Sequence, residues 1–396
     1  MRTLPFEGGR RTMARALVVA AAGLGLTLIL GLVGDGRRVL QAYHVAFVYW
    51  AGIAVGTLLI NMVFHAGKAT WYVVLRRVLE SIPLSAPLFL LLFVPVLLGM
   101  GHIFPWVNPA GLDEELRRLA EHRRPYLNVP FFVLRTVLYF ALWFVVAHLL
   151  HRWSVRQDEE RGVALTLRQR RLGAGALPFV AVALTFAAFD WQMSLDLHLA
   201  STIFGVYYFA GSFLAAFAVL ILAMNGAQAE GLPGRLLNAN HYHSLGKYLL
   251  SFVCFWAYIA FSQYLLIWIA NLPEEVPWYL ARDRGAWLPL SVFLVVFHFL
   301  VPFFVLLSRD LKRSPRALGF VAVWILVVHY VDVYWVMMPA LRHEDAHGLT
   351  PHLADLTAMA GIGAAAFAFV LWRMRGRAAV PIGDPYLEDS LRYDPS

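Results

Sequence analysis

Cysteine and charge are both scarce in this sequence. The single cysteine, Cys254, lies inside an apolar run, so the chain cannot form an internal disulfide. The sequence has no Cys-x-x-Cys-His motif and no cysteine-rich run, which excludes a c-type haem or an iron–sulfur cluster held by this chain. Only 15% of the residues are charged, too few for an ordinary soluble enzyme.

Apolar residues are correspondingly abundant. They make up 60% of the 396 residues, and the mean hydropathy is +0.63. Ten apolar runs are each close to the roughly 20 residues that a helix needs to cross the hydrocarbon. We therefore predict an all-α polytopic membrane protein with about ten transmembrane helices and no sizeable soluble domain. The runs are Ala16–Val33, Ala42–Phe64, Ile82–Met100, Phe131–Leu150, Leu172–Phe189, Leu199–Met224, Tyr248–Ala270, Trp287–Leu307, Leu318–Met338 and Pro351–Trp372.

The basic residues predict the orientation. The net charge of +8 comes mainly from Lys and Arg in short loops between the apolar runs, so it does not indicate a nucleic-acid partner. Most of them lie on the side of the N-terminus, for example in the loop Arg156–Gln169. By the positive-inside rule both termini are cytoplasmic, and the link Asp190–His198 faces the periplasm. The first run is long and lacks a clear cleavage site, so we predict a retained span and not a signal peptide.

A short internal echo suggests how the spans are grouped. The second span contains YWAG at residues 49–52, and the sixth contains YFAG at residues 208–211. Four matched residues fit either an internal repeat or a chance match. The offsets favour two four-helix bundles, spans two to five and six to nine, with the first and last spans peripheral. The expected divisions are 1–40 (tail and first helix), 41–191 (first bundle), 192–340 (second bundle), 341–380 (last helix) and 381–396 (cytoplasmic tail).

Ionisable residues inside the spans are the candidates for chemistry, because a charge in hydrocarbon costs at least ~2.5 kcal/mol by insertion scales. Arg76 and Glu80 share a helix face just before the third span, which Pro83, Pro87 and Pro95 are expected to kink. They are either a snorkelling interfacial ion pair or, with Lys247 as a neighbour from the other bundle, the inner mouth of a proton path.

Three further candidates lie near mid-membrane. His329 and Asp332 are spaced i, i+3 in the ninth span, and His298 is at a similar depth in the eighth. Histidine titrates near neutral pH and a nearby carboxylate stabilises the imidazolium, which suits proton relay. The alternative is a hydrogen bond that only joins the helices. A b-type haem would need two facing histidines, and only His298 and His329 are suitably placed for it.

The outer candidates surround the central link. Asp190, Asp196 and His198 are the outermost proton-relay candidates, so the candidates together cover the full depth of the membrane. His44 and Arg135 lie near the level of Asp190, and the three either bind a quinone or lipid headgroup or leave Arg135 simply paired with Asp190. The link itself is either an ordinary wet loop with Trp191 at the headgroup level or a functional tip.

Several segments resemble one family closely. The link and its flanks read TFAAFDWQMSLDLHLASTIFG at residues 185–205, and RPYLNVPFF at 124–132 leads into the fourth span. HYVDVYW at 329–335 and the acidic DPYLEDSL at 384–391 complete the set. Together they resemble the NrfD-like membrane subunits of alternative complex III, a bacterial quinol:cytochrome c (or other acceptor) oxidoreductase. The match is closer to the ActF-like than to the ActC-like paralogue.

This resemblance implies a multi-pass subunit of the bacterial cytoplasmic membrane with no cofactor and no metal of its own. It contributes to assembly and to proton translocation coupled to oxidation of menaquinol or ubiquinol. The implied partners, besides membrane lipids, carry the redox centres as haem c and iron–sulfur clusters: a multihaem cytochrome c subunit, an iron–sulfur subunit, the sister ActC-like subunit, small membrane subunits, a monohaem cytochrome c and a terminal oxidase. A secondary transporter and a purely structural scaffold for redox subunits remain the alternatives.

Overall fold

The computed structural model describes residues 9–229, 236–273, 275–341 and 348–394, and these residues form helices and no strand. Ten helical segments are long and apolar enough to cross a membrane, which confirms the predicted all-α polytopic fold. They are α1 (Arg10–Val33), α2 (Gly36–Ala66), a broken segment of α3 (Val73–Ser81), α4 (Ala86–Leu92) and α5 (Val94–Leu98), α8 (Val129–Glu160), α9 (Val163–Trp191), α10 (Phe204–Ala229), α11 (Ala239–Ala270), α13 (Trp287–Leu294) with α14 (Val301–Leu307), α16 (Pro315–Leu341) and α17 (Leu353–Met374).

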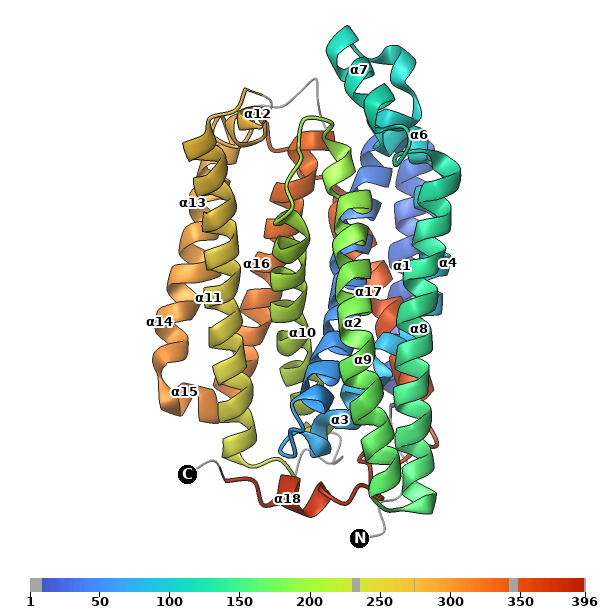
Figure 1. The fold of residues 1–396 in the computed structure, drawn as a ribbon, viewed down its shortest axis with the longest axis vertical. Coiled ribbons are helices and arrows are strands. Elements are labelled where there is room, and N and C mark those ends of the chain that lie inside the picture. The colour runs from blue at the N-terminus through green and yellow to red at the C-terminus, as the bar shows by residue number, and fades with distance from the viewer. Residues whose placement is uncertain (1–8, 230–235, 274, 342–347, 395–396) are drawn as a thin grey trace.

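The helices form two four-helix bundles with a peripheral pair, as predicted. Helices α2, α3–α5, α8 and α9 make the first bundle, and α10, α11, α13–α14 and α16 make the second. Helices α1 and α17 pack on each other and against α2 (Figure 1). The short helices α6 (Met100–Ile103), α7 (Glu114–Arg123) and α12 (Val276–Leu280) lie at one end of the molecule, the α7 end. Helices α3 and α18 (Leu387–Leu391) lie at the opposite end, the α18 end.

The third span is broken where its prolines predicted a kink. Pro83, Pro87 and Pro95 each stand in the first turn of a new short helix, where the missing N–H of proline costs nothing. The eighth span contains a different irregularity, a π-helical turn over Val295–Leu300 between α13 and α14.

Several helices continue well past the apolar runs that mark them. Helix α8 ends at Glu160 and α9 begins at Val163, so the expected loop Arg156–Gln169 is helix on both sides of a two-residue turn. Arg161 and Gly162 make that turn with φ of 51° and 96°. Hydropathy marks the part of a helix that lies in lipid and is silent about its polar extension, which explains the error.

The two bundles meet where the YWAG and YFAG segments cross. A Cβ on Gly56 would lie 2.6 Å from the Ser212 carbonyl oxygen, so α2 and α10 approach closely only because glycine is there. The Tyr208 hydroxyl donates to the Val48 carbonyl at 2.8 Å, which ties the two helices together. The Tyr49 ring reaches across to α16 and packs 5.4 Å from the His329 ring.

The peripheral pair depends on another close approach. A Cβ on Gly23 of α1 would lie 2.8 Å from the backbone of Gly361 in α17. One turn further along α1, the hydroxyls of Thr27 and Thr357 share a hydrogen bond of 2.7 Å. Small residues of this kind let helices in lipid gain van der Waals contact between their backbones.

Gly23→Val is expected to destabilise the protein by about 1–3 kcal/mol, because the added side chain overpacks the α1–α17 contact. Gly25→Val is the matched control, since a Cβ on Gly25 of the same helix meets nothing within 4 Å. Unfolding in mixed detergent micelles, followed by circular dichroism, measures both. Equal losses in the two variants would contradict the packing argument.

Candidate functional site

Five buried side chains gather inside the second bundle and form what we call the mid-bundle cluster. They are Tyr207 of α10, Trp256 of α11, His298 of the π-helical turn, and His329 and Asp332 of α16. The structure thus brings together the three mid-membrane residues expected from the sequence. The two aromatic members were not expected, because a tyrosine or tryptophan in an apolar run carries no signal of its own.

Asp332 is the centre of this cluster. One of its carboxylate oxygens accepts a short hydrogen bond from the Tyr207 hydroxyl. The other accepts from the Trp256 indole N–H at 3.1 Å and lies 3.5 Å from Nδ1 of His329. A carboxylate withdrawn from water needs such donors, because an unpaired buried charge is costly. Asp332 therefore holds the Tyr207 and Trp256 side chains in place beside the His329 ring.

His298 has an unusual local setting. It is fully buried, its ring lies 5.9 Å from that of His329, and the Trp256 ring packs against it at 3.9 Å. Neither ring nitrogen has a hydrogen-bond partner among the described residues. The residue sits on the π-helical turn, a feature that is frequent at functional sites. Both nitrogens of this imidazole are therefore open to a polar group that the described side chains do not supply.

A second cluster, the α18-end cluster, surrounds Arg76. The guanidinium lies 2.5 Å from the Asp384 carboxylate and 3.2 Å from that of Glu80. The expected Arg76–Glu80 ion pair is therefore present, but both side chains are buried and do not snorkel to the surface. Nearby, Arg77 pairs with Asp158 at 2.6 Å, and Glu80 lies 3.6 Å from His151.

The segment that contains Asp384 covers this end of both bundles (Figure 1). The Ser390 hydroxyl donates to the Trp71 carbonyl at 2.6 Å and accepts from the Val74 N–H at 3.1 Å. Further along, the Tyr393 hydroxyl shares a hydrogen bond of 2.9 Å with Ser244 of the second bundle. The predicted cytoplasmic tail is thus, over its described residues, a strap that seals the α18-end cluster.

Lys247 does not join this cluster. Its side chain is exposed on α11, and its electrostatic neighbours include Lys312 and His243, both cationic or titratable groups of the second bundle. The expected approach of Lys247 to Arg76 and Glu80 is therefore wrong. The position of Lys247 just before the seventh apolar run could not reveal which face of α11 its side chain occupies.

At the α7 end of the first bundle, Arg135 and Asp190 form the simple pair that the sequence allowed. Two parallel hydrogen bonds of 2.9 and 2.8 Å join them, and the Tyr139 hydroxyl donates to the same carboxylate at 2.8 Å. The Arg135 guanidinium also lies over the Tyr126 ring at 3.8 Å. Outside the spans, burial raises the pKa of Tyr126, so its hydroxyl stays protonated beside this pair.

Trp191 is not an exposed anchor, so the link does not have the form of an ordinary wet loop with an aromatic anchor. Trp191 is fully buried against Phe47 and Phe140 in the first bundle. His44 has no contact with Arg135; it instead forms a hydrogen bond of 2.7 Å with the Trp191 carbonyl. Arg135 thus contacts the Asp190 side chain, whereas His44 contacts the backbone of the next residue. The three side chains do not converge on one open site.

The rest of the link leads towards the second bundle. Asp196 is half-buried, and its carboxylate accepts from the His198 N–H at 2.9 Å. It acts electrostatically on Arg282, a buried residue that sequence reasoning missed. Arg282 donates to the Trp335 and Val336 carbonyls at the end of α16. Burial lowers the pKa of its guanidinium to about 9, so Arg282 remains a cation at neutral pH.

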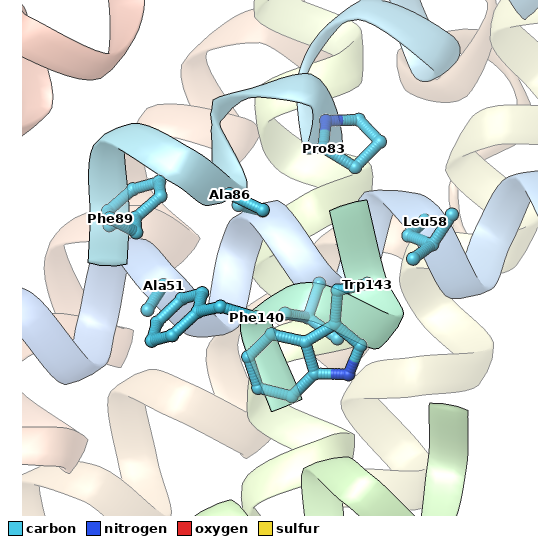
Figure 2. Close-up of a pocket in the computed structure, with 9 residues that line it drawn as sticks. Ala51, Leu58, Pro83, Ala86, Phe89, Phe140 and Trp143 are labelled. Atoms are coloured by element: carbon cyan, nitrogen blue, oxygen red, sulfur yellow. The ribbon is translucent and has the colours of Figure 1, made fainter. Parts of the chain in front are cut away.

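The proton-relay candidates expected at successive depths do not lie in one bundle; they are divided between the interiors of the first and second bundles. In the first bundle an apolar cavity of about 10 Å³, the lower limit for one water, lies between the polar ends (Figure 2). Phe89, Phe140 and Trp143 are among its lining residues. The mid-bundle cluster lies in the other bundle. The Arg76 and Asp332 groups therefore do not face one continuous interior.

Among the described residues, no three His, Cys, Asp or Glu side chains are grouped to hold a metal ion. Comparison of the sequence with models of protein families and with curated proteins gives no match.

Asp384→Asn is expected to destabilise the protein by about 3–5 kcal/mol, since it leaves the Arg76 guanidinium buried with less countercharge. Glu388→Gln in the same segment is the matched control, because its side chain is 83% exposed and 4.0 Å from Arg392. Detergent unfolding and protease cleavage within residues 380–394 report the change. A stability equal to that of the control would show that the strap does not depend on this ion pair.

Proposed function

We propose that this chain is an NrfD-like membrane subunit of a bacterial quinol oxidoreductase that passes electrons to cytochrome c or another acceptor. It carries no cofactor, supports assembly of the complex and contributes to proton translocation coupled to quinol oxidation. The sequence resemblance supports the family, and the two four-helix bundles with a peripheral pair agree with its architecture. Menaquinol or ubiquinol would be the substrate of the whole complex, with haem c and iron–sulfur clusters on partner subunits.

The mid-bundle cluster is the observation that carries this proposal. A carboxylate and two imidazoles, all buried, lie within one bundle of a membrane protein, where ionisable groups are rare and usually functional. Nδ1 of His329 lies 3.5 Å from the Asp332 carboxylate, and the His298 ring lies 5.9 Å from the His329 ring. We propose that protons are exchanged among these three groups. Tyr207 and Trp256 hold the carboxylate in the acceptor geometry that this exchange needs.

The polar groups favour a half-path from the cluster to the α7 end. Tyr207 is an electrostatic neighbour of both Asp332 and Arg282, and Arg282 in turn neighbours Asp196. The corresponding stretch of the first bundle is filled by aromatic rings and the small apolar cavity. We therefore place proton transfer in the second bundle and assign the aromatic core of the first bundle to assembly.

A secondary transporter is the second candidate. The broken third span and the π-helical turn of the eighth favour it, because transporters bind substrates at discontinuous helices. Co-purification of the chain with multihaem and iron–sulfur subunits would exclude this candidate.

The orientation can be tested with two labelled cysteines in a Cys254→Ser background. Glu159→Cys places a thiol on the exposed end of α8 at the α18 end, and Glu115→Cys places one on α7. We expect a membrane-impermeant maleimide to label Glu115→Cys in intact spheroplasts and Glu159→Cys only in inverted vesicles. The reverse pattern would overturn the proposed cytoplasmic location of the termini.

Asp332→Asn tests the coupling role. Asparagine keeps the shape but offers one acceptor oxygen for two donors, so we expect a stability loss of about 1–3 kcal/mol with assembly intact. Quinol oxidation by the complex in detergent should be largely unchanged. Proton translocation per electron in sealed vesicles should fall.

Asp310→Asn is the matched control, since Asp310 is exposed at the start of α15 (Arg309–Arg313). Normal translocation by Asp332→Asn would make Asp332 a purely structural hydrogen-bond acceptor.

A further inference from the structure

A large cavity at the α7 end lies apart from the polar clusters described above. Its volume is about 810 Å³, and it is enclosed by the start of α2, the segment from α6 to α7, the end of α16 and the start of α17. Arg37, Arg38 and His102 bring cationic or protonatable nitrogen to its wall, and Asp35 and Asp113 bring carboxylates.

The two carboxylates are already engaged as helix caps. Asp35 accepts from the backbone N–H groups of Arg37 and Arg38 at the start of α2. Asp113 accepts from the Leu116 N–H at the start of α7. Neither Asp35 nor Asp113 forms an ion pair with a described arginine of this cavity.

Arg37 and Arg38 differ in the N–H donors that they can offer to a ligand in the cavity. Arg38 is only 7% exposed and uses one terminal nitrogen for the Thr350 carbonyl at 3.0 Å and the Asp355 carboxylate at 2.5 Å. Its Nε and its other terminal nitrogen have no hydrogen-bond partner among the described residues, but both atoms are buried and do not face the cavity. Arg37 and His102 are exposed on the same wall. The exposed Arg37 and His102 side chains therefore offer N–H donors to the cavity, which suit an anion with several acceptor oxygens.

Apolar surface adjoins the cavity along the chain. Leu32 and Val33 end α1 just before Asp35 and are 77% and 85% exposed. Leu98, three residues before the lining residue Gly101, is 84% exposed. In a membrane-spanning chain these side chains meet acyl chains, so the cavity stands at the boundary between hydrocarbon and water.

We propose that this cavity binds the phosphate of a phospholipid headgroup from the leaflet at the α7 end. The phosphodiester oxygens accept from Arg37 and His102, and the acyl chains follow Leu32, Val33 and Leu98. Phosphate is the group that arginine donors match best, and free phosphate lacks the tails that the adjoining surface would hold. This site is independent of the function proposed above.

Native mass spectrometry of the delipidated full chain, titrated with lipid, tests the proposal. The probes are phosphatidylglycerol, the diacylglycerol with the same acyl chains, and inorganic phosphate. We expect saturable binding of one phosphatidylglycerol that diacylglycerol does not reproduce and millimolar phosphate only partly displaces. Arg37→Gln should weaken this binding about tenfold, as expected for loss of a hydrogen bond to a charged group, and Arg37→Lys should restore most of it.

Arg118→Gln is the matched control, an exposed arginine of α7 outside the cavity. It should bind phosphatidylglycerol like the unmodified chain. Equal effects of Arg37→Gln and Arg118→Gln, or equal binding of diacylglycerol, would overturn the proposal. Complete displacement by inorganic phosphate at the same concentration as the lipid would overturn the lipid as its source. Because Arg37 is exposed, these variants are expected to fold, and their unfolding midpoints confirm it.

Discussion

Enclosure of helix α2 is the constraint on which the rest of the architecture depends. In the apolar stretch that could cross the membrane, 89% of the α2 residues are buried within the protein, against 22% of those in α1. Helices of both bundles and the peripheral α17 pack around it. Such enclosure requires small residues where backbones meet, and Gly56 against the Ser212 carbonyl is a close backbone contact towards α10. Through this contact Tyr49 of the first bundle reaches His329 of the second, so the mid-bundle cluster is built partly by the neighbouring bundle.

The two bundles share an architecture but not an interior. The first is filled by interlocked aromatic rings, and its buried Arg76 and Arg135 are each paired with a carboxylate towards opposite ends. The second carries a carboxylate and two imidazoles within its core. In a low-dielectric interior a proton moves only between groups that can hold it, so the bundles are suited to different tasks. In the function proposed above, the first bundle is a support and proton transfer takes place in the second.

Much of the fold was predictable because lipid leaves a helix few alternatives, and hydropathy therefore reports the spans directly. The grouping of His298 with His329 and Asp332 followed from depth and from the i, i+3 spacing. Contacts between residues far apart in sequence were not predictable. Asp384 looked like part of a solvated acidic tail, since nothing local shows that it pairs with Arg76. The burial of Trp191 was missed for a similar reason, because an aromatic at the end of an apolar run equally fits a headgroup anchor.

The pairing of Arg76 with Asp384 also has a consequence for biogenesis. The two residues are 308 positions apart, so a ribosome adding roughly 5–20 residues per second completes the first bundle long before Asp384 emerges. During that interval the inserted helices carry a guanidinium whose second carboxylate partner has not yet been synthesised. The bundle must mature in two stages, insertion followed by a late docking step at the membrane surface. That delay gives membrane quality control a defined interval in which to recognise chains that never complete the strap.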